Sequence, residues 1–75
     1  MERSMGLTAG VSDLFLAVPN KHYSGFWIEL KASGKKPSEL QNDWLLRSRL
    51  AGYRADWYDS YDSAKSAIVD YLEDR

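Results

Sequence analysis

Three residues in the first half of the chain carry side chains that could do chemistry together: Asp13, Glu29 and Lys31. Glu29 and Lys31 stand two apart in an apolar stretch, and residues two apart on a strand project from the same face. Asp13 begins the preceding apolar stretch, and its carboxylate would meet that of Glu29 if the antiparallel register sets the start of this stretch beside the end of the next. These carboxylates and the backbone carbonyl of Leu30 offer the hard oxygen ligands that Mg²⁺ prefers. Such a cation would polarise a phosphate ester and acidify a bound water, while Lys31 would position that water or offset negative charge.

The position of this charged pair inside an apolar strand favours the metal hypothesis. Charges in such a strand are costly unless they face a cleft or an ion. The alternative is an exposed hairpin face that carries a cross-strand ion pair. Spacing alone favours that alternative, because Glu-x-Lys triplets are frequent in ordinary sequences.

Composition excludes several other kinds of site. The 75 residues contain no cysteine and one histidine, His22. A disulfide scaffold, a thiolate zinc site, a cysteine nucleophile and a site of several histidines are therefore excluded. The longest apolar run, Leu14–Val18, is far shorter than the roughly 20 residues that span a bilayer. The N-terminus lacks the order of a secretory signal. We expect a cytoplasmic domain without a membrane partner.

Two strands and a turn must position the three residues. Residues 13–18 and 25–32 are rich in strand formers, and the polar turn 19–24 is too short for a crossover helix. These stretches therefore predict an antiparallel hairpin. Alternation in the second stretch places Phe26, Ile28 and Leu30 on one face and Trp27, Glu29 and Lys31 on the other.

The second half of the chain predicts two helices around a third strand. Ser38 and Gln41 form a capping-box pattern, which begins a helix that ends near Ala51 before Gly52. Residues 54–58 read as a strand, and Asp59 or Ser60 caps the last helix. One stripe of that helix is apolar; it consists of Ala64, Ala67, Ile68, Tyr71 and Leu72.

The order β-β-α-β-α predicts a mixed α/β (α+β) fold, a small sheet flanked by helices in a single domain over residues 1–75. The strand–helix–strand unit predicts a right-handed crossover with parallel pairing. A domain of this length buries only about 60% of its extended surface, and a three-stranded sheet leaves exposed edges. We therefore expect a homodimer.

Charge is distributed unevenly, although the net charge is −1. Residues 21–54 carry seven basic and three acidic residues, a net of +4, whereas residues 59–75 carry two basic and five acidic, a net of −3. A basic middle is compatible with phosphate binding. The candidate phosphate contacts are Lys35, Lys36, Arg47 and Arg49; ordinary solvated surface explains each of them equally well.

The motifs resemble those of the VRR-NUC domain, a branch of the PD-(D/E)xK nuclease superfamily. The matching segments are Gly10–Leu16 (G-V-S-D-L-F-L), Phe26–Lys31 (F-W-I-E-L-K), and Ser38-x-x-Gln41-x-x-Trp44, followed by Gly52-Tyr53. The match keeps motif order and spacing from about Met5 to Leu72.

The resemblance implies a restriction-endonuclease-like core that cleaves DNA with Mg²⁺ or Mn²⁺. It implies that Asp13, Glu29 and the Leu30 carbonyl bind the metal, that Lys31 is the catalytic lysine, and that Gln41 lies at the cleft. A role in the capping box explains the presence of Gln41 equally well. Stand-alone phage members of the family are small homodimers that cut branched DNA such as four-way junctions, and the shortness of this chain resembles that type.

Two departures from the family pattern stand out. Ser12 replaces the usual proline before the aspartate, a change from which we expect little effect on chemistry. The family also has an upstream helix and strand where only Met1–Gly10 stands here, so we expect a trimmed chain or a partner that supplies this layer. The alternative functions are a non-catalytic nuclease-like domain for DNA binding or assembly, and a small interaction domain.

Overall fold

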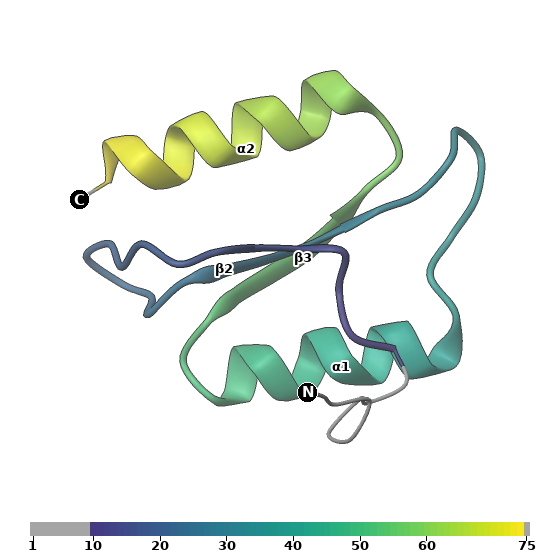
Figure 1. Cartoon of the computed structure of the whole chain (residues 1–75), viewed down its shortest axis with the longest axis horizontal. Helices are drawn as coiled ribbons and strands as arrows, with labels where there is room; N and C mark the ends of the chain where they lie inside the picture. The colour runs from purple at the N-terminus through teal and green to yellow at the C-terminus, as the bar shows by residue number, and fades with distance from the viewer. Residues whose placement is uncertain (1–9, 75) are drawn as a thin grey trace, which may run out of the picture.

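The computed structural model describes residues 10–74, which form a three-stranded sheet between two helices (Figure 1). The elements are β1 (Leu14–Leu16), β2 (Phe26–Leu30), α1 (Glu39–Leu50), β3 (Arg54–Tyr58) and α2 (Tyr61–Glu73). The expectation about the segment before Gly10 lies outside the described residues. No helix within residues 10–74 has the length and apolar character needed to cross a membrane.

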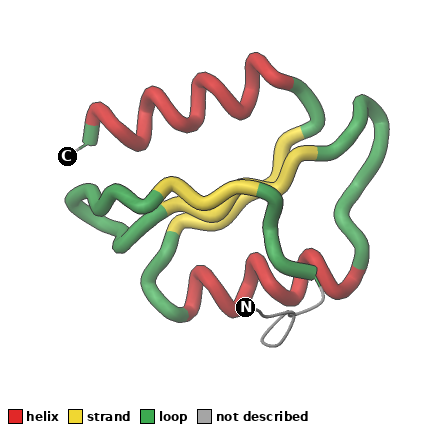
Figure 2. Tube along the Cα trace, viewed as in Figure 1, coloured by secondary structure: helices red, strands yellow, loops and turns green. Residues whose placement is uncertain are grey.

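The sheet has the order β1-β2-β3, with β1 and β2 antiparallel and β2 and β3 parallel (Figure 2). The predicted mixed fold is confirmed, and β3 has its predicted bounds, whereas β1 and β2 are shorter than the stretches that predicted them. Strand β1 ends at Leu16 instead of Val18, and β2 spans five residues of the stretch 25–32. Both β1 and β3 are edge strands of this sheet.

The two helices cover opposite faces of the sheet (Figure 1). On the α2 side, Phe26 and Ile28 of β2 are buried against Ala67 and Tyr71. The predicted stripe of α2 is confirmed, since Ala64, Ala67 and Tyr71 are buried and Ile68 and Leu72 pack against the core. Leu30 lies at the end of the strand and is 42% exposed.

Hydrogen bonds join the hairpin turn to α2. The Tyr71 hydroxyl donates to the Val18 carbonyl over 2.6 Å, and the Asn20 side-chain amide donates to the Tyr71 carbonyl over 3.1 Å. The Asn20 side-chain oxygen also accepts from the Tyr23 backbone, which shapes the turn. His22 is exposed and pairs with Asp74 at 3.3 Å, a surface position consistent with its place in a turn.

Helix α1 begins and ends where the sequence predicts. The Ser38 hydroxyl accepts from the Gln41 backbone, and the Gln41 side chain accepts from the Ser38 backbone, so the capping box is complete. Gly52 follows the helix with a φ of +101°, a conformation that favours glycine and directs the chain into β3. Helix α2 takes Ser60 as its N-cap.

Candidate metal and catalytic centre

The hairpin register places Asp13 opposite Glu29. Leu14 pairs with Ile28 and Leu16 with Phe26, so continuing the register by one residue brings positions 13 and 29 together. Directly opposite residues of an antiparallel pair project from the same face. Asp13 is held at this position by its Oδ2, which accepts from the Leu30 backbone N–H over 3.0 Å.

Glu29 is a buried acidic residue, with only 1% of its surface exposed. Its Oε2 accepts from Gln41 Nε2 over 2.9 Å and lies 3.9 Å from Lys31 Nζ. Its Oε1 is buried and has no hydrogen-bond partner among the described residues. This burial excludes the exposed hairpin face that was the alternative explanation of the Glu-x-Lys triplet.

Gln41 connects the helix cap to the acidic centre. Its Oε1 accepts from Lys31 Nζ over 3.1 Å and from the Ser38 backbone over 2.8 Å, while its Nε2 donates to Glu29. The sequence left open whether Gln41 caps the helix or lies at the cleft. One side-chain conformation does both, so the start of α1 fixes the relative positions of Glu29 and Lys31.

The electrostatics of the centre favour a bound cation. Burial raises the pKa of Glu29 above its ordinary value of 4.5, the Asp13 carboxylate raises that pKa further, and the Lys31 ammonium opposes both effects. A carboxylate that is buried, next to a second carboxylate and has an oxygen without a partner lacks positive charge. The Lys31 ammonium supplies only part of the positive charge that would balance the two carboxylates.

The donor set suits a hard divalent cation. Asp13, which directly precedes β1, and Glu29 of β2 would provide carboxylate ligands, and the Leu30 carbonyl is the third ligand that the sequence predicts. The described part of the chain contains no cluster of three or more His, Cys, Asp and Glu residues. Mg²⁺ does not require such a cluster, because it is commonly held by one or two carboxylates and completed by waters and substrate phosphates. The residues present therefore fit the metal that the sequence predicts.

The four candidate phosphate contacts lie in different settings. Lys35 and Lys36 are exposed in the loop between β2 and α1. Arg47 pairs with Asp43 at 3.1 Å on the surface of α1. Arg49 donates to the Ala55 carbonyl over 2.7 Å and to Asp56 over 3.2 Å, so its guanidinium joins α1 to β3. Arg49 consequently has a structural role that the sequence did not indicate.

Aromatic side chains continue the same face of the sheet beyond the acidic centre. Phe15 stacks on Trp27 with ring centroids 4.2 Å apart, and Trp44 of α1 meets Trp27 edge to face at 5.3 Å. The sequence motifs included Trp44 and Tyr53 but did not single out Trp27 as part of a site. The available signal was the alternation of β2, which places Trp27 on the face of Glu29.

A solved structure described as a "VRR_NUC domain protein" resembles this chain with a TM-score of 0.89 and 26% sequence identity. The chain has the VRR_NUC fold. The likeness covers 95% of this chain and 59% of that one, so the chain spans somewhat more than half of the length of its structural relative. No family model matches the sequence, and no curated protein matches it either. The VRR_NUC resemblance drawn from the motifs is thus confirmed through the fold.

Proposed function

We propose that this chain is a Mg²⁺- or Mn²⁺-dependent endonuclease that hydrolyses phosphodiester bonds in branched DNA, such as four-way junctions. The observation that carries the proposal is the buried Glu29 carboxylate. It lies opposite Asp13 and is joined to Lys31 through Gln41, within a VRR_NUC fold. Burying an acidic side chain whose Oε1 has no partner among residues 10–74 is costly, and a bound cation would offset that cost.

Each residue of the centre has a distinct role in this proposal. Asp13, Glu29 and the Leu30 carbonyl would hold the cation, which supplies positive charge opposite the scissile phosphate and lowers the pKa of water. Lys31 is held by Gln41 Oε1 and would orient the attacking water and offset the negative charge of the transition state. Gln41 is a positioning residue, because it contacts both Glu29 and Lys31 through one amide.

The substrate surface would combine the basic residues around the centre. Lys35 and Lys36 in the exposed loop would contact phosphates, Arg47 would do so by exchanging its exposed ion pair with Asp43, and binding through them would weaken as salt rises. Arg49 would contribute less than these three, because its guanidinium already contacts β3.

A homodimer would place two centres on a branched substrate. Strand β1 is an edge strand, and its Leu14 and Phe15 are 47% and 41% exposed, which supports pairing between copies along this edge. A two-fold axis would present the two centres to opposite strands of a junction. Sedimentation measures this association independently of cleavage.

Cleavage of a synthetic four-way junction in Mg²⁺ or Mn²⁺ tests the proposal. We expect Asp13→Asn and Lys31→Ala to lower the rate at least a hundredfold, while the matched surface variants Asp62→Asn and Lys65→Ala on α2 cut at the wild-type rate. Unchanged cutting by both centre variants would refute the assigned roles.

Calorimetric titration with Mn²⁺ separates the nuclease from a non-catalytic module. We expect binding at or below the millimolar range in the wild-type chain and its loss in Asp13→Asn. A wild-type chain that binds DNA but shows neither metal binding nor cleavage would instead be a nuclease-like domain for binding or assembly.

A further inference from the structure

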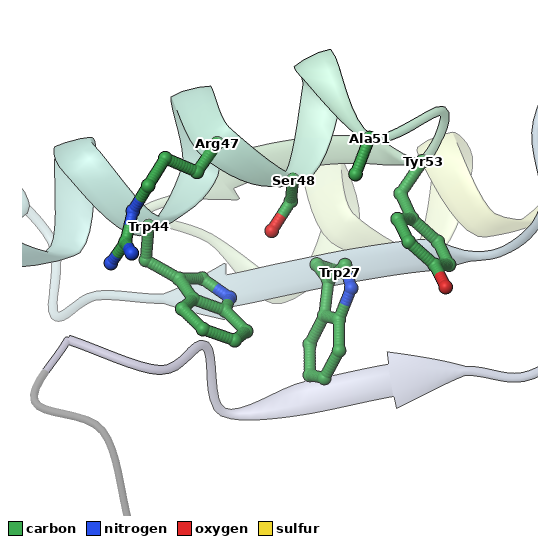
Figure 3. A pocket seen from close by; sticks show the side chains of 6 residues that line it. All are labelled: Trp27, Trp44, Arg47, Ser48, Ala51 and Tyr53. Atoms are coloured by element: carbon green, nitrogen blue, oxygen red, sulfur yellow. The ribbon is translucent and has the colours of Figure 1, made fainter.

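A cavity of about 300 Å³ lies beside the metal and catalytic centre, between α1 and the sheet (Figure 3). We call it the aromatic pocket; its lining residues are Trp27, Trp44, Arg47, Ser48, Ala51 and Tyr53. Figure 3 shows the rings of Trp27, Trp44 and Tyr53 projecting into one shared space below the helix, with Arg47 at one end. The volume is at the lower end of the range for small-molecule sites.

The pocket and the centre lie on the same face of the sheet. Trp27 precedes Glu29 by two residues on β2, and Phe15 follows Asp13 by two residues along the paired strand. Two residues of a strand span about 7 Å, so a phosphate at the centre and a group in the pocket would be neighbours along one ligand. On the helix side, Gln41 contacts the centre and Trp44, one turn later, lines the pocket.

The rings are held in fixed planes. Phe15 stacks on Trp27 at an interplanar angle of 28°, and its edge meets Tyr53 at a centroid distance of 5.8 Å. Trp44 stands at 88° to Trp27, so the two tryptophans form perpendicular walls. Rings held in this way offer flat apolar surface at little further cost in conformational entropy.

A charged side chain distinguishes the pocket from ordinary apolar packing. The Arg47 guanidinium lies 5.9 Å from the centroid of the Trp44 ring. A ligand suited to the pocket is therefore planar and aromatic and is attached to negative charge.

We propose that the aromatic pocket binds one unpaired nucleobase of the DNA strand cut at the metal and catalytic centre. This inference rests on the proposed function and names the feature of the substrate that the chain selects. A nucleobase has a π-face for the rings and is attached to a phosphate within reach of Arg47. A base inside an intact duplex cannot enter the pocket, so strands with unpaired nucleotides at forks, flaps or junction centres are preferred.

Fluorescence of 2-aminopurine in metal-free buffer tests this directly. The probe is an oligonucleotide with a single unpaired 2-aminopurine beside a duplex, mixed with the chain in EDTA so that no cleavage occurs. We expect binding to quench the probe through stacking, and Trp44→Leu to weaken binding about tenfold. Binding to a fully paired duplex changes less than twofold in the same variant. Tyr61→Leu, at an aromatic position of α2 that is 76% exposed, serves as the matched control and leaves both affinities unchanged.

A second variant keeps the test valid if Trp44→Leu fails to fold. Trp44→Phe retains a ring with a smaller stacking surface, and we expect it to keep the quenching with a threefold to fivefold loss of affinity. Equal affinity of wild type and both variants for the unpaired probe would overturn the proposal. A shift in the monomer–dimer equilibrium of Trp44→Leu, with oligonucleotide affinity unchanged, would overturn it in favour of a contact between copies. Because no metal is present, these results are independent of whether Asp13 and Lys31 support cleavage.

Discussion

The Gln41 side chain donates to the Glu29 carboxylate over 2.9 Å while it completes the N-terminal cap of α1. A capping box is ordinarily a local device that satisfies free backbone groups at the start of a helix. Here its side chain also contacts the acidic residue and, through Oε1, the Lys31 ammonium. Helix stability and the geometry of the centre therefore depend on the same amide.

Replacing Gln41 by alanine is expected to lower both stability and metal affinity. The free energy of unfolding should fall by about 1 kcal/mol, because one half of the cap is lost. Mn²⁺ affinity and cleavage should fall about 10- to 100-fold, the usual cost of removing a group that orients metal ligands. Urea denaturation and Mn²⁺ calorimetry on the same preparation measure the two effects.

Ser38→Ala is the matched control for that variant. It removes the hydroxyl that accepts from the Gln41 backbone but leaves the Gln41 side-chain amide in place. We expect a similar loss of stability with metal affinity within twofold of wild type. If Ser38→Ala lowers metal affinity as much as Gln41→Ala does, Gln41 acts through the helix alone and its contact with Glu29 is incidental.

Glu29→Gln is expected to stabilise the metal-free protein at neutral pH. The substitution removes a buried charge and its repulsion with Asp13, while the amide oxygen of the new side chain can still accept from Gln41. A gain of about 1 kcal/mol, or about 4–8 °C in Tm, is the usual size for relief of a destabilised functional site. Thermal unfolding in EDTA measures the gain, and in Mn²⁺ only the wild-type chain should rise further. A lower Tm of the variant in EDTA would contradict the electrostatic account.

The difference between wild type and Glu29→Gln should depend on pH. The pKa of Glu29 is raised in the folded state, so the folded chain holds this proton more tightly than the unfolded chain does. The resulting stabilisation is present below pH 4.5, the ordinary value, and is lost as pH rises through the raised pKa. The stability advantage of the variant should therefore be smallest in acid and increase as pH rises from 4.5. Urea midpoints of both proteins in EDTA, measured across this pH range, test the predicted direction. A stability advantage of the variant that shrinks as pH rises would contradict a raised pKa of Glu29.

Gly10→Ala is expected to disturb the approach to Asp13. Gly10 has a φ of +86°, and a Cβ there would stand 2.4 Å from the Leu40 carbonyl oxygen. The Leu40 backbone cannot move aside as a flexible side chain can. We therefore expect the free energy of unfolding to fall by about 2–3 kcal/mol and metal binding to weaken. Gly34→Ala is the control, since its φ is +80° and no described atom lies within 4 Å of the new Cβ. The free energy of unfolding of that variant should fall by about 1 kcal/mol, the cost of placing alanine at a positive φ without a new contact. Equal losses in the two variants would show that the contact with Leu40 is unimportant.

Local patterns in the sequence predicted most of the elements. The alternation of β2, the capping box at Ser38 and the stop at Gly52 each depend on residues close in sequence, and each is confirmed. The pairing of Asp13 with Glu29 was one register that the predicted hairpin allowed, and the observed register has it. Strand ends were less predictable, since the apolar run continues past the last paired residue of β1.

Features that depend on packing between distant elements could not be predicted. The sequence did not determine whether the face of β2 that carries Glu29 is buried or exposed. The position of α1 over the sheet buries this face. Arg49 looked like free surface charge because its partner Asp56 lies beyond a turn, on the next strand. The aromatic pocket requires Trp27, Trp44 and Tyr53 from three separate segments, a combination that no single periodic pattern contains.

The two faces of strand β2 have different roles. Its even-numbered residues Phe26 and Ile28 pack with α2, whereas the odd-numbered Trp27 and Glu29 face α1 and carry the proposed chemistry. Protein engineers could therefore repack the α2 layer for heat tolerance while leaving the reactive layer untouched. Conversely, a library of variants with substitutions only in the α1 layer could be screened for new substrates while the core packed against α2 stays unchanged.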